Sequence, residues 1–186
     1  LLVGPDGNHA RRLARAETSD SWTPRGTVLI TGGTGALGTR VAHWAAATAD
    51  RVVLTSRRGG EVPEGLPEST RVVAVDSTDR DAMAALVAEV SPNAVLHAAG
   101  TLDDGVLDRL TPERLHAVAA AKPVALRVLD DLTRDLDLDA FVVFSSAAAT
   151  FGAPGQGNYA AANAELDALV RARHAAGLPG TAIAWG

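Results

Sequence analysis

Short, continuous apolar runs recur along the chain, and most are followed by a longer stretch of mixed apolar and polar residues. Continuous runs are typical of strands buried on both faces of a parallel sheet. The runs that predict strands are "TVLIT" (27–31), "RVVLT" (51–55), "RVVAV" (71–75), "AVLH" (94–97), "AFVVF" (140–144) and "TAIAW" (181–185). The stretches that predict helices lie at 36–48, 79–90, 112–134 and 158–175. This alternation predicts an α/β fold with a doubly wound parallel sheet and helices on both faces.

Two regions fall outside the alternation. Within residues 1–25, the turn residues Pro5-Asp6-Gly7 lie between two short stretches and predict a hairpin. We interpret it as the end of a preceding structural subdomain, joined by a linker to a catalytic domain over residues 26–186. Residues 57–70 should hold a crossover helix, yet two prolines and three glycines disfavour one. We expect either an open loop there or a place where part of the natural sequence is missing.

Composition narrows the class of function. The 186 residues are 47% hydrophobic and carry a net charge of −5, which suits one well-packed domain. The lack of a basic cluster argues against nucleic acid, and the lack of an apolar run of about 18 residues argues against a membrane span. The chain has no cysteine, and its histidines lack metal-ligand spacing. We therefore predict no metal site, and we expect a reducing, cytoplasmic location.

The first strand leads directly into the glycine-rich turn "GTGALG" (33–38), which opens a helix. This GxGxxG pattern between a strand and a helix predicts a dinucleotide site. Gly33 would permit the tight turn, Gly35 the approach of a pyrophosphate, and Gly38 close packing of helix on strand. A P-loop is excluded because no Lys-Ser/Thr pair follows the glycines.

The second strand ends in Ser56-Arg57-Arg58, where NAD-binding sites place an acid that holds the ribose 2′-hydroxyl. A hydroxyl and a guanidinium would instead bind a 2′-phosphate, so we predict NADPH as the cofactor. Asp76, after the third strand, could accept hydrogen bonds from the adenine amine, and "HAAG" (97–100) places small residues beside the nicotinamide. The predicted cofactor-binding residues are Gly33, Thr34, Gly35, Leu37, Gly38, Ser56, Arg57, Asp76, Ser77, Ala99, Gly100, Lys122 and Tyr159.

Candidate catalytic residues gather at the carboxyl end of the fifth strand, where the crevice of such a sheet opens. Ser146 ends that strand, Tyr159 follows 13 residues later, and Asn163 lies one helical turn beyond it on the same face. Lys122, the only lysine of the chain, lies on the preceding helix. Ketone reduction needs a proton donor, and an ammonium beside a phenol lowers the phenol pKa from about 10. We therefore expect Lys122 close to the single tyrosine.

Five sequence blocks, in this order, resemble those of the short-chain dehydrogenase/reductases. More narrowly, they resemble the catalytic half of ketoreductase domains from modular type I polyketide synthases. The blocks are "TGGTGALG", "LTSRRG", "HAAGTLDDGVLDRLTPERL", "FSSAA" and "GQGNYAAANAELDAL", within residues 26–186. Many relatives outside this subgroup carry Tyr-x-x-x-Lys. This chain has Asn163 at that place and Lys122 upstream, an exchange characteristic of polyketide ketoreductases.

The resemblance implies a role for each candidate residue. Ser146 would hold the ketone oxygen and Tyr159 would donate the proton. Lys122 would favour the tyrosinate and hold the nicotinamide ribose, and Asn163 would order a proton-relay water. Pro123, where relatives have valine, should kink the helix that carries Lys122 and so change the reach of its side chain.

The resemblance also implies the reaction and its partners. The reaction is NADPH-dependent reduction of a β-ketoacyl thioester to a D-β-hydroxyacyl thioester during polyketide chain elongation. The partners are an acyl carrier protein bearing the phosphopantetheine-linked chain, the neighbouring synthase domains and the preceding structural subdomain. Relatives continue past residue 186 into a lid over the substrate, and this lid is absent from the sequence.

Residues Leu102-Asp103-Asp104 bear on stereochemistry. In the resembled family, this motif marks B-type ketoreductases, which make the D-configured alcohol. A-type members have tryptophan where this chain has Phe151, and epimerising members have proline where it has Ala161. We therefore expect a B-type, non-epimerising enzyme. Asp104 would bind a loop that shapes the substrate entrance rather than touch the substrate. The alternative is that the two acids form a solvated turn in which Asp104 caps a short helix.

Two rival functions remain open on sequence alone. An inactive, reductase-like structural domain would lack the glycine fingerprint and the Ser/Tyr/Lys set that this chain carries. An extended-type sugar-nucleotide epimerase shares "TGGTG", but Asn163 and the missing acid after the second strand argue against it.

Overall fold

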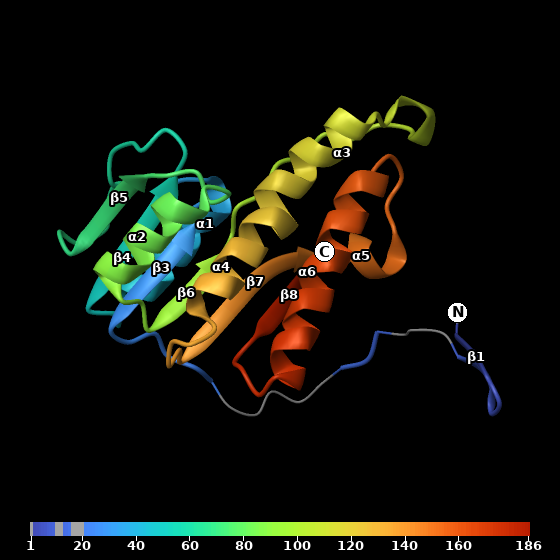
Figure 1. Cartoon of the computed structure of the whole chain (residues 1–186), viewed down its shortest axis with the longest axis horizontal. Coiled ribbons are helices and arrows are strands. Elements are labelled where there is room, and N and C mark those ends of the chain that lie inside the picture. Colours follow the sequence, from blue (N-terminus) through green and yellow to red (C-terminus); the bar gives the residue numbers. More distant parts are fainter. Residues whose placement is uncertain (1, 10–12, 16–20) are drawn as a thin grey trace.

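A computed structural model of the chain describes residues 2–9, 13–15 and 21–186. Its main feature is a parallel sheet of six strands in the order β5-β4-β3-β6-β7-β8 (Figure 1). The strands are β3 (Thr27–Thr31), β4 (Arg51–Ser56), β5 (Thr70–Ala74), β6 (Ala94–His97), β7 (Ala140–Ser146) and β8 (Thr181–Trp185). The order reverses between β3 and β6, and a crevice opens beyond the carboxyl ends of strands at such a switch point. The predicted doubly wound parallel sheet is confirmed.

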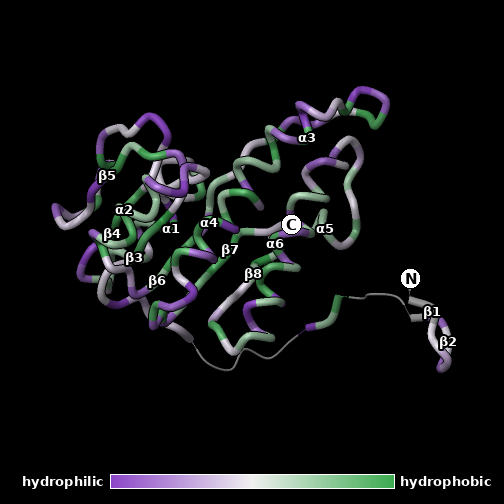
Figure 2. Tube along the Cα trace, viewed as in Figure 1, coloured by the Kyte–Doolittle hydropathy of each residue, from purple (hydrophilic) through white to green (hydrophobic). Residues whose placement is uncertain are grey.

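Helices cover the sheet on both faces, because alternate side chains of each buried strand point in opposite directions. The helices α2 (Arg80–Val90), α4 (Ala125–Thr133) and α6 (Gly157–Ala175) pack on one face, with Leu29 and Val53 below them. Helix α1 (Ala36–Ala46) packs on the other face, over Ile30 and Leu54. The strands are apolar along much of their length, as Figure 2 shows.

Helix α1 leaves part of its side of the sheet uncovered. An apolar groove of about 690 Å³ lies there over β7 and β8, lined in part by Trp44, Phe144 and Trp185. Of the predicted site residues, only Leu37 lines this groove, so it is separate from the predicted chemistry.

The stretch 112–134 is helical as predicted, but it is not one regular α-helix. Helix α3 (Pro112–Ala119) passes into a π-helical turn, η2 (Ala120–Val124), before α4 begins. Pro123 has no backbone N–H and cannot make the regular i→i−4 bond, and a wider turn accommodates this defect without breaking the rod. The three segments run on as one rod in Figure 1.

The remaining expectations concern loops and the hairpin. Strands β1 (Leu2–Gly4) and β2 (Gly7–His9) pair antiparallel, as predicted, in a sheet of their own. Residues 10–12 and 16–20 of the predicted linker lie outside the described residues. Residues 57–69 of this sequence form an open loop without a helix, and the absence of natural sequence at this place stays the second alternative. The short helices η1 (Leu107–Arg109) and α5 (Ala148–Phe151) were not predicted, since three or four residues carry no periodicity.

In the part of the chain that the structure describes, no helix has both the length and the apolarity needed to cross a membrane.

Candidate active site

The crevice at the carboxyl ends of the strands consists of two adjacent cavities of about 540 and 610 Å³. They share five lining residues: Gly32, Gly35, Ala98, Gly100 and Thr101. The structure brings nearly all of the predicted cofactor-binding residues to this crevice. The first cavity is lined by Thr34, Gly35, Ser56, Arg57, Asp76, Ser77, Ala99 and Gly100, and the second by Gly35, Leu37, Gly38, Gly100, Lys122 and Tyr159.

The glycine turn after β3 corrects one sequence assignment. Gly32, not Gly33, adopts the left-handed conformation that turns the chain, with φ of +69°. Gly33 is needed for packing instead, because a Cβ there would lie 2.7 Å from the side chain of Leu54. A Cβ on Gly38 would lie 2.1 Å from the Gly32 carbonyl oxygen, so Gly38 is needed for close packing of the helix on the glycine turn rather than on the strand itself.

The amino-terminal end of α1 is suited to bind a pyrophosphate. Gly35 occupies the N-cap position without a side-chain cap, and the first turn contains no acid. The free N–H groups and the positive end of the helix dipole therefore attract an anion. A Cβ on Gly35 would meet only the Gly32 carbonyl oxygen, at 3.3 Å, so any side chain there would extend into the crevice. The space that a phosphate needs exists because position 35 is glycine.

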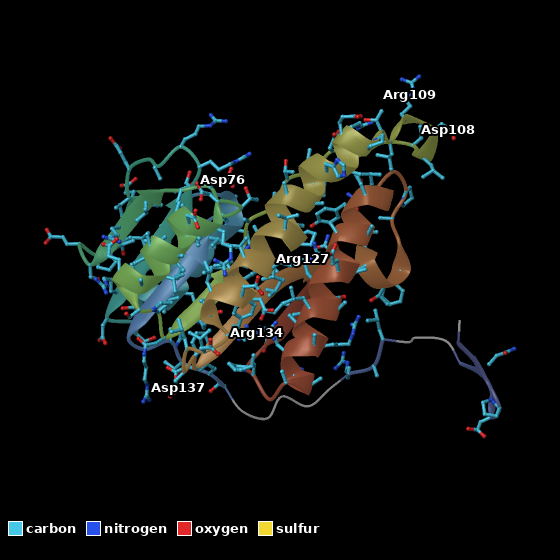
Figure 3. The ribbon with its side chains drawn as sticks, viewed as in Figure 1. Asp76, Asp108, Arg109, Arg127, Arg134 and Asp137 are labelled. Atoms are coloured by element: carbon cyan, nitrogen blue, oxygen red, sulfur yellow. The ribbon has the colours of Figure 1, made fainter. Side chains whose placement is uncertain are left out.

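Arg57 and Asp76 lie at the far end of the crevice, where the adenosine half of a dinucleotide would bind. Arg57 is exposed and forms no ion pair within the described residues, which leaves its guanidinium available to a 2′-phosphate. Hydrogen bonds from the Thr78 amide and hydroxyl hold the pKa of Asp76 below its ordinary value, and the positive charge of Arg57 adds to this. Asp76 is labelled in Figure 3. These residues fit NADPH.

Lys122 reaches the catalytic end of the crevice despite Pro123. The π-helical turn places its ammonium in the interior, where it donates to the Phe144 carbonyl oxygen at 3.0 Å and to Asn163 Oδ1 at 2.9 Å. Its Nζ lies 5.3 Å from the centre of the Tyr159 ring. Burial lowers the pKa of Lys122 from its ordinary value of 10.5 to about 8, so it remains largely charged at neutral pH. The proximity of the only lysine to the only tyrosine is confirmed.

Asn163 joins Lys122 to the helix that carries Tyr159. Its side chain is fully buried, its oxygen accepts from Lys122, and its nitrogen donates to the Tyr159 carbonyl oxygen at 2.8 Å. The amide thus has a protein partner on each side. Holding Lys122 is the contact that the structure shows, and ordering a relay water stays a prediction.

The two serines at the end of β7 have different surroundings. Ser145 is buried and donates its hydroxyl proton to the Asn163 carbonyl oxygen at 3.4 Å. The Ser146 oxygen instead accepts from the Ala148 amide at 3.1 Å, which leaves its proton available for a ketone oxygen. Ser145 lines the second cavity, whereas Ser146 lines neither of the two cavities. The free hydroxyl proton fits Ser146 as a donor to a ketone oxygen, and that role stays a prediction.

The segment Leu102–Asp104 borders the same crevice, with Leu102 in its lining. The Asp104 carboxylate accepts from Gln156 Nε2 at 2.8 Å, which favours the loop-binding alternative over helix capping. Asn158 donates to the Asp103 carbonyl oxygen at 2.8 Å, and Arg114 binds the Asp103 carboxylate. Sequence reasoning missed Arg114, Gln156 and Asn158. Only the position of Gln156 and Asn158 beside Tyr159 could have drawn attention to them.

His97 lies beneath the glycine turn, where its Nδ1 is 2.6 Å from the Thr31 hydroxyl. Burial, with the nearby charge of Lys122, lowers the pKa of His97 to about 3, so the imidazole is neutral. This hydrogen bond joins the end of β6 to the end of β3. Within residues 2–9, 13–15 and 21–186, no group of three or more His, Cys, Asp or Glu side chains could hold a metal ion.

Known proteins match both the sequence and the fold. Polyketide synthase GfsA of Streptomyces halstedii is 54% identical over 195 residues, a match that covers 95% of this chain and 3% of that protein. The solved structure of the first ketoreductase of the tylosin PKS has a TM-score of 0.90 at 52% identity. That match covers 99% of this chain and 44% of the other. The chain therefore spans only a small part of GfsA and under half of the solved ketoreductase.

A-type ketoreductases from a modular polyketide synthase are also similar, with a TM-score of 0.83 at 46% identity over 95% of this chain and 41% of theirs. This similarity to an A-type enzyme does not assign a stereochemical type to this chain. Residues 26–186 match the family model described as KR domain. With the dinucleotide crevice and the Lys122–Asn163–Tyr159 cluster in place, the chain belongs to the ketoreductase (KR) domain family of polyketide synthases.

Proposed function

We propose that this chain is the catalytic part of an NADPH-dependent β-ketoacyl reductase. It would reduce a β-ketoacyl thioester on an acyl carrier protein to the D-β-hydroxyacyl thioester during polyketide chain elongation. The observation that carries the proposal is the buried ammonium of Lys122 beside Tyr159, at the catalytic end of a dinucleotide crevice. Membership of the KR family supports ketone reduction over the epimerase and the inactive domain.

Three residues of the chain have separate roles in protonating the ketone oxygen. NADPH, when bound, supplies the hydride for the ketone carbon. The Ser146 hydroxyl donates a hydrogen bond to the ketone oxygen and orients the carbonyl. Tyr159 transfers its phenolic proton to that oxygen as negative charge develops. Lys122, held by Asn163 and the Phe144 carbonyl, stabilises the phenolate that remains.

The proposal includes partner proteins and domains that are not part of this structure. An acyl carrier protein would deliver the phosphopantetheine-linked substrate, and neighbouring synthase domains would flank the reductase. The hairpin β1–β2 would belong to the preceding structural subdomain. These assignments rest on family membership and on the small share of GfsA that the chain spans.

The proposed reaction is tested by one assay with two readouts. A ketoreductase domain of full length carrying this sequence is given NADPH and a simple β-ketoacyl thioester, and NADPH oxidation is followed. Chiral chromatography then identifies the product. We expect turnover and a predominantly D-configured alcohol, with an α-substituent left uninverted. No oxidation by a folded, NADPH-binding protein contradicts the proposed activity, and a mainly L-configured product contradicts the B-type assignment alone.

Arg57→Glu should weaken NADPH binding at least about tenfold and improve NADH binding. A charge-assisted contact to the 2′-phosphate is worth about 1.5–3 kcal/mol, and the new carboxylate suits a 2′-hydroxyl. Fluorescence titration of both cofactors measures the change. Arg58→Glu is the matched control, because Arg58 carries the same charge one residue away and does not line the crevice; its effect should be smaller. Equal affinity of the unmutated protein for NADH and NADPH would show that Ser56 and Arg57 do not select the cofactor.

A further inference from the structure

Residues 103–109 form an excursion between β6 and α3, and Arg114 of α3 binds both of its ends. At the start of the excursion, its guanidinium donates to the Asp103 carboxylate from Nε at 2.9 Å and to the Asp104 carbonyl oxygen from Nη2 at 2.8 Å. At the end, Nη1 donates to the Arg109 carbonyl oxygen at 2.7 Å. Arg109 and the neighbouring Asp108 are labelled in Figure 3. One side chain therefore closes the loop.

The closed excursion is in turn bonded to the segment that leads into α6. The Gly105 amide donates to the Gly155 carbonyl oxygen at 2.7 Å, and residues 105 and 156 form a parallel bridge. The Asp104 carboxylate accepts from Gln156. Asn158 donates to the Asp103 carbonyl oxygen and accepts from the Tyr159 amide at 2.8 Å. A continuous series of hydrogen bonds thus connects Arg114, through Asp103 and Asn158, to the backbone of Tyr159.

The shape of the guanidinium matters as well as its charge. A Cβ on Gly105 would lie 2.7 Å from Arg114 Nη1, so the planar fork lies directly against that glycine. The Arg114 side chain is 28% exposed and Asp103 36%, so the pair is partly shielded from water. A lysine would keep the charge, but its single ammonium could not reach Asp103, Asp104 and Arg109 together.

These contacts lie beside the proposed substrate site. Leu102, directly before the excursion, lines the second cavity together with Tyr159 and Lys122. A shift of residues 102–105 relative to residues 155–159 would therefore alter one wall of the cavity. The bonds of Arg114, Gln156 and Asn158 oppose that shift.

We propose that Arg114 is a positioning residue that fixes residues 102–105 against residues 155–159 and so sets the width of the substrate entrance beside Tyr159. The structural part of this inference stands on the contacts above. The part that concerns substrate rests on the proposed ketoreductase function.

Hydrogen exchange on the chain itself tests the structural part. Arg114→Lys should raise amide exchange by about tenfold or more in peptides covering 103–109 and also in peptides covering 152–158, because both segments lose a shared anchor. Arg127→Lys is the control: Arg127 lies on α4, where it is labelled in Figure 3, and its ion pair is with Glu165 of α6 rather than with either segment. It should leave both peptides unchanged. Faster exchange in 103–109 alone, or in neither segment, overturns the inference.

A second variant keeps the test decisive if Arg114→Lys does not fold. Asp103→Asn keeps an acceptor oxygen for Arg114 and removes the charge, so it should raise exchange in the same two segments to a smaller extent. Unchanged exchange in residues 152–158 of this variant also overturns the inference.

Kinetics in the full-length ketoreductase domain test the substrate part. Arg114→Lys should raise KM for the β-ketoacyl thioester about tenfold and increase the minor alcohol, while kcat changes less. Unchanged KM and stereochemical purity would overturn the positioning role. If the unmutated domain reduces no ketone, the proposed function fails, whereas the exchange experiment still decides whether Arg114 couples the two segments.

Discussion

Tyr159→Phe should lower kcat by about 10²- to 10⁴-fold, the usual contribution of general acid catalysis. Phenylalanine keeps the ring and its packing but has no proton to give to the ketone oxygen. The Tyr159 backbone contacts to Asn158 and Asn163 do not involve the hydroxyl, so the helix should be unaffected. Turnover of a β-ketoacyl thioester by the full-length ketoreductase domain, with NADPH in excess, measures the loss.

Cofactor binding provides the control for this variant. NADPH titration should show a far smaller change in Kd than in kcat, because Tyr159 is only one of the predicted cofactor-binding residues, and this would show that the crevice is intact. Turnover within about threefold of the unmutated value would contradict the assignment of Tyr159 as proton donor.

Lys122→Arg should lose most of the activity, at least about tenfold, while the fold survives. The site holds a compact ammonium between the Phe144 carbonyl and Asn163, and Gly100 packs against the lysine stem, where a Cβ would lie 3.0 Å from Lys122 Cε. The wider, planar guanidinium cannot occupy this position and still place its charge beside Tyr159. Steady-state turnover measures the loss, and circular dichroism verifies the fold. Near-normal turnover would show that a generic positive charge suffices.

The pH dependence follows from the same lysine. Since burial lowers the pKa of Lys122 to about 8, the charge that stabilises the phenolate is present below that pH, and activity should fall as the pH rises through it. Stability changes in the opposite sense. Between pH 8 and 10.5 the unfolded chain holds a proton on Lys122 that the folded chain has released, so the free energy of unfolding rises with pH. The free energy of unfolding is measured by denaturant titration at each pH for the unmutated chain and for Lys122→Met. The difference between the two proteins isolates the contribution of Lys122. A difference that is flat or falling across that window would contradict a buried, destabilised ammonium.

The strand predictions succeeded because their signal is local. Runs such as 27–31 and 94–97 are apolar throughout, and a strand buried on both faces requires that of every residue. The glycine turn was recognised for the same reason, since strand, turn and helix N-terminus are consecutive in sequence. Even there the left-handed residue was assigned one position too late, because Gly32 and Gly33 are alike in composition and differ only in what surrounds them.

The helix around Lys122 shows a different limit. Proline inside a helical stretch predicts a disturbance, and the sequence indicated a kink at Pro123. A π-helical turn accommodates the missing N–H instead and leaves α3 and α4 in one rod. Which of the two occurs depends on packing: Lys122 and Pro123 are buried in the interior, where the lysine finds two acceptors.

By itself, the sequence determined the parallel α/β sheet, the glycine fingerprint, the likeness to polyketide ketoreductases and the residues expected to carry the chemistry. These depend on periodicity and on neighbours a few positions apart. Only the tertiary structure decided that Lys122 binds Asn163, 41 positions away, and that Asp104 binds Gln156, 52 positions away. Crossover connections bring the carboxyl ends of the strands to one edge of the sheet, and no local pattern specifies which side chains meet there. The sequence around Arg114 predicts a helix but gives no indication that Arg114 binds Asp103. Only the structure shows this contact.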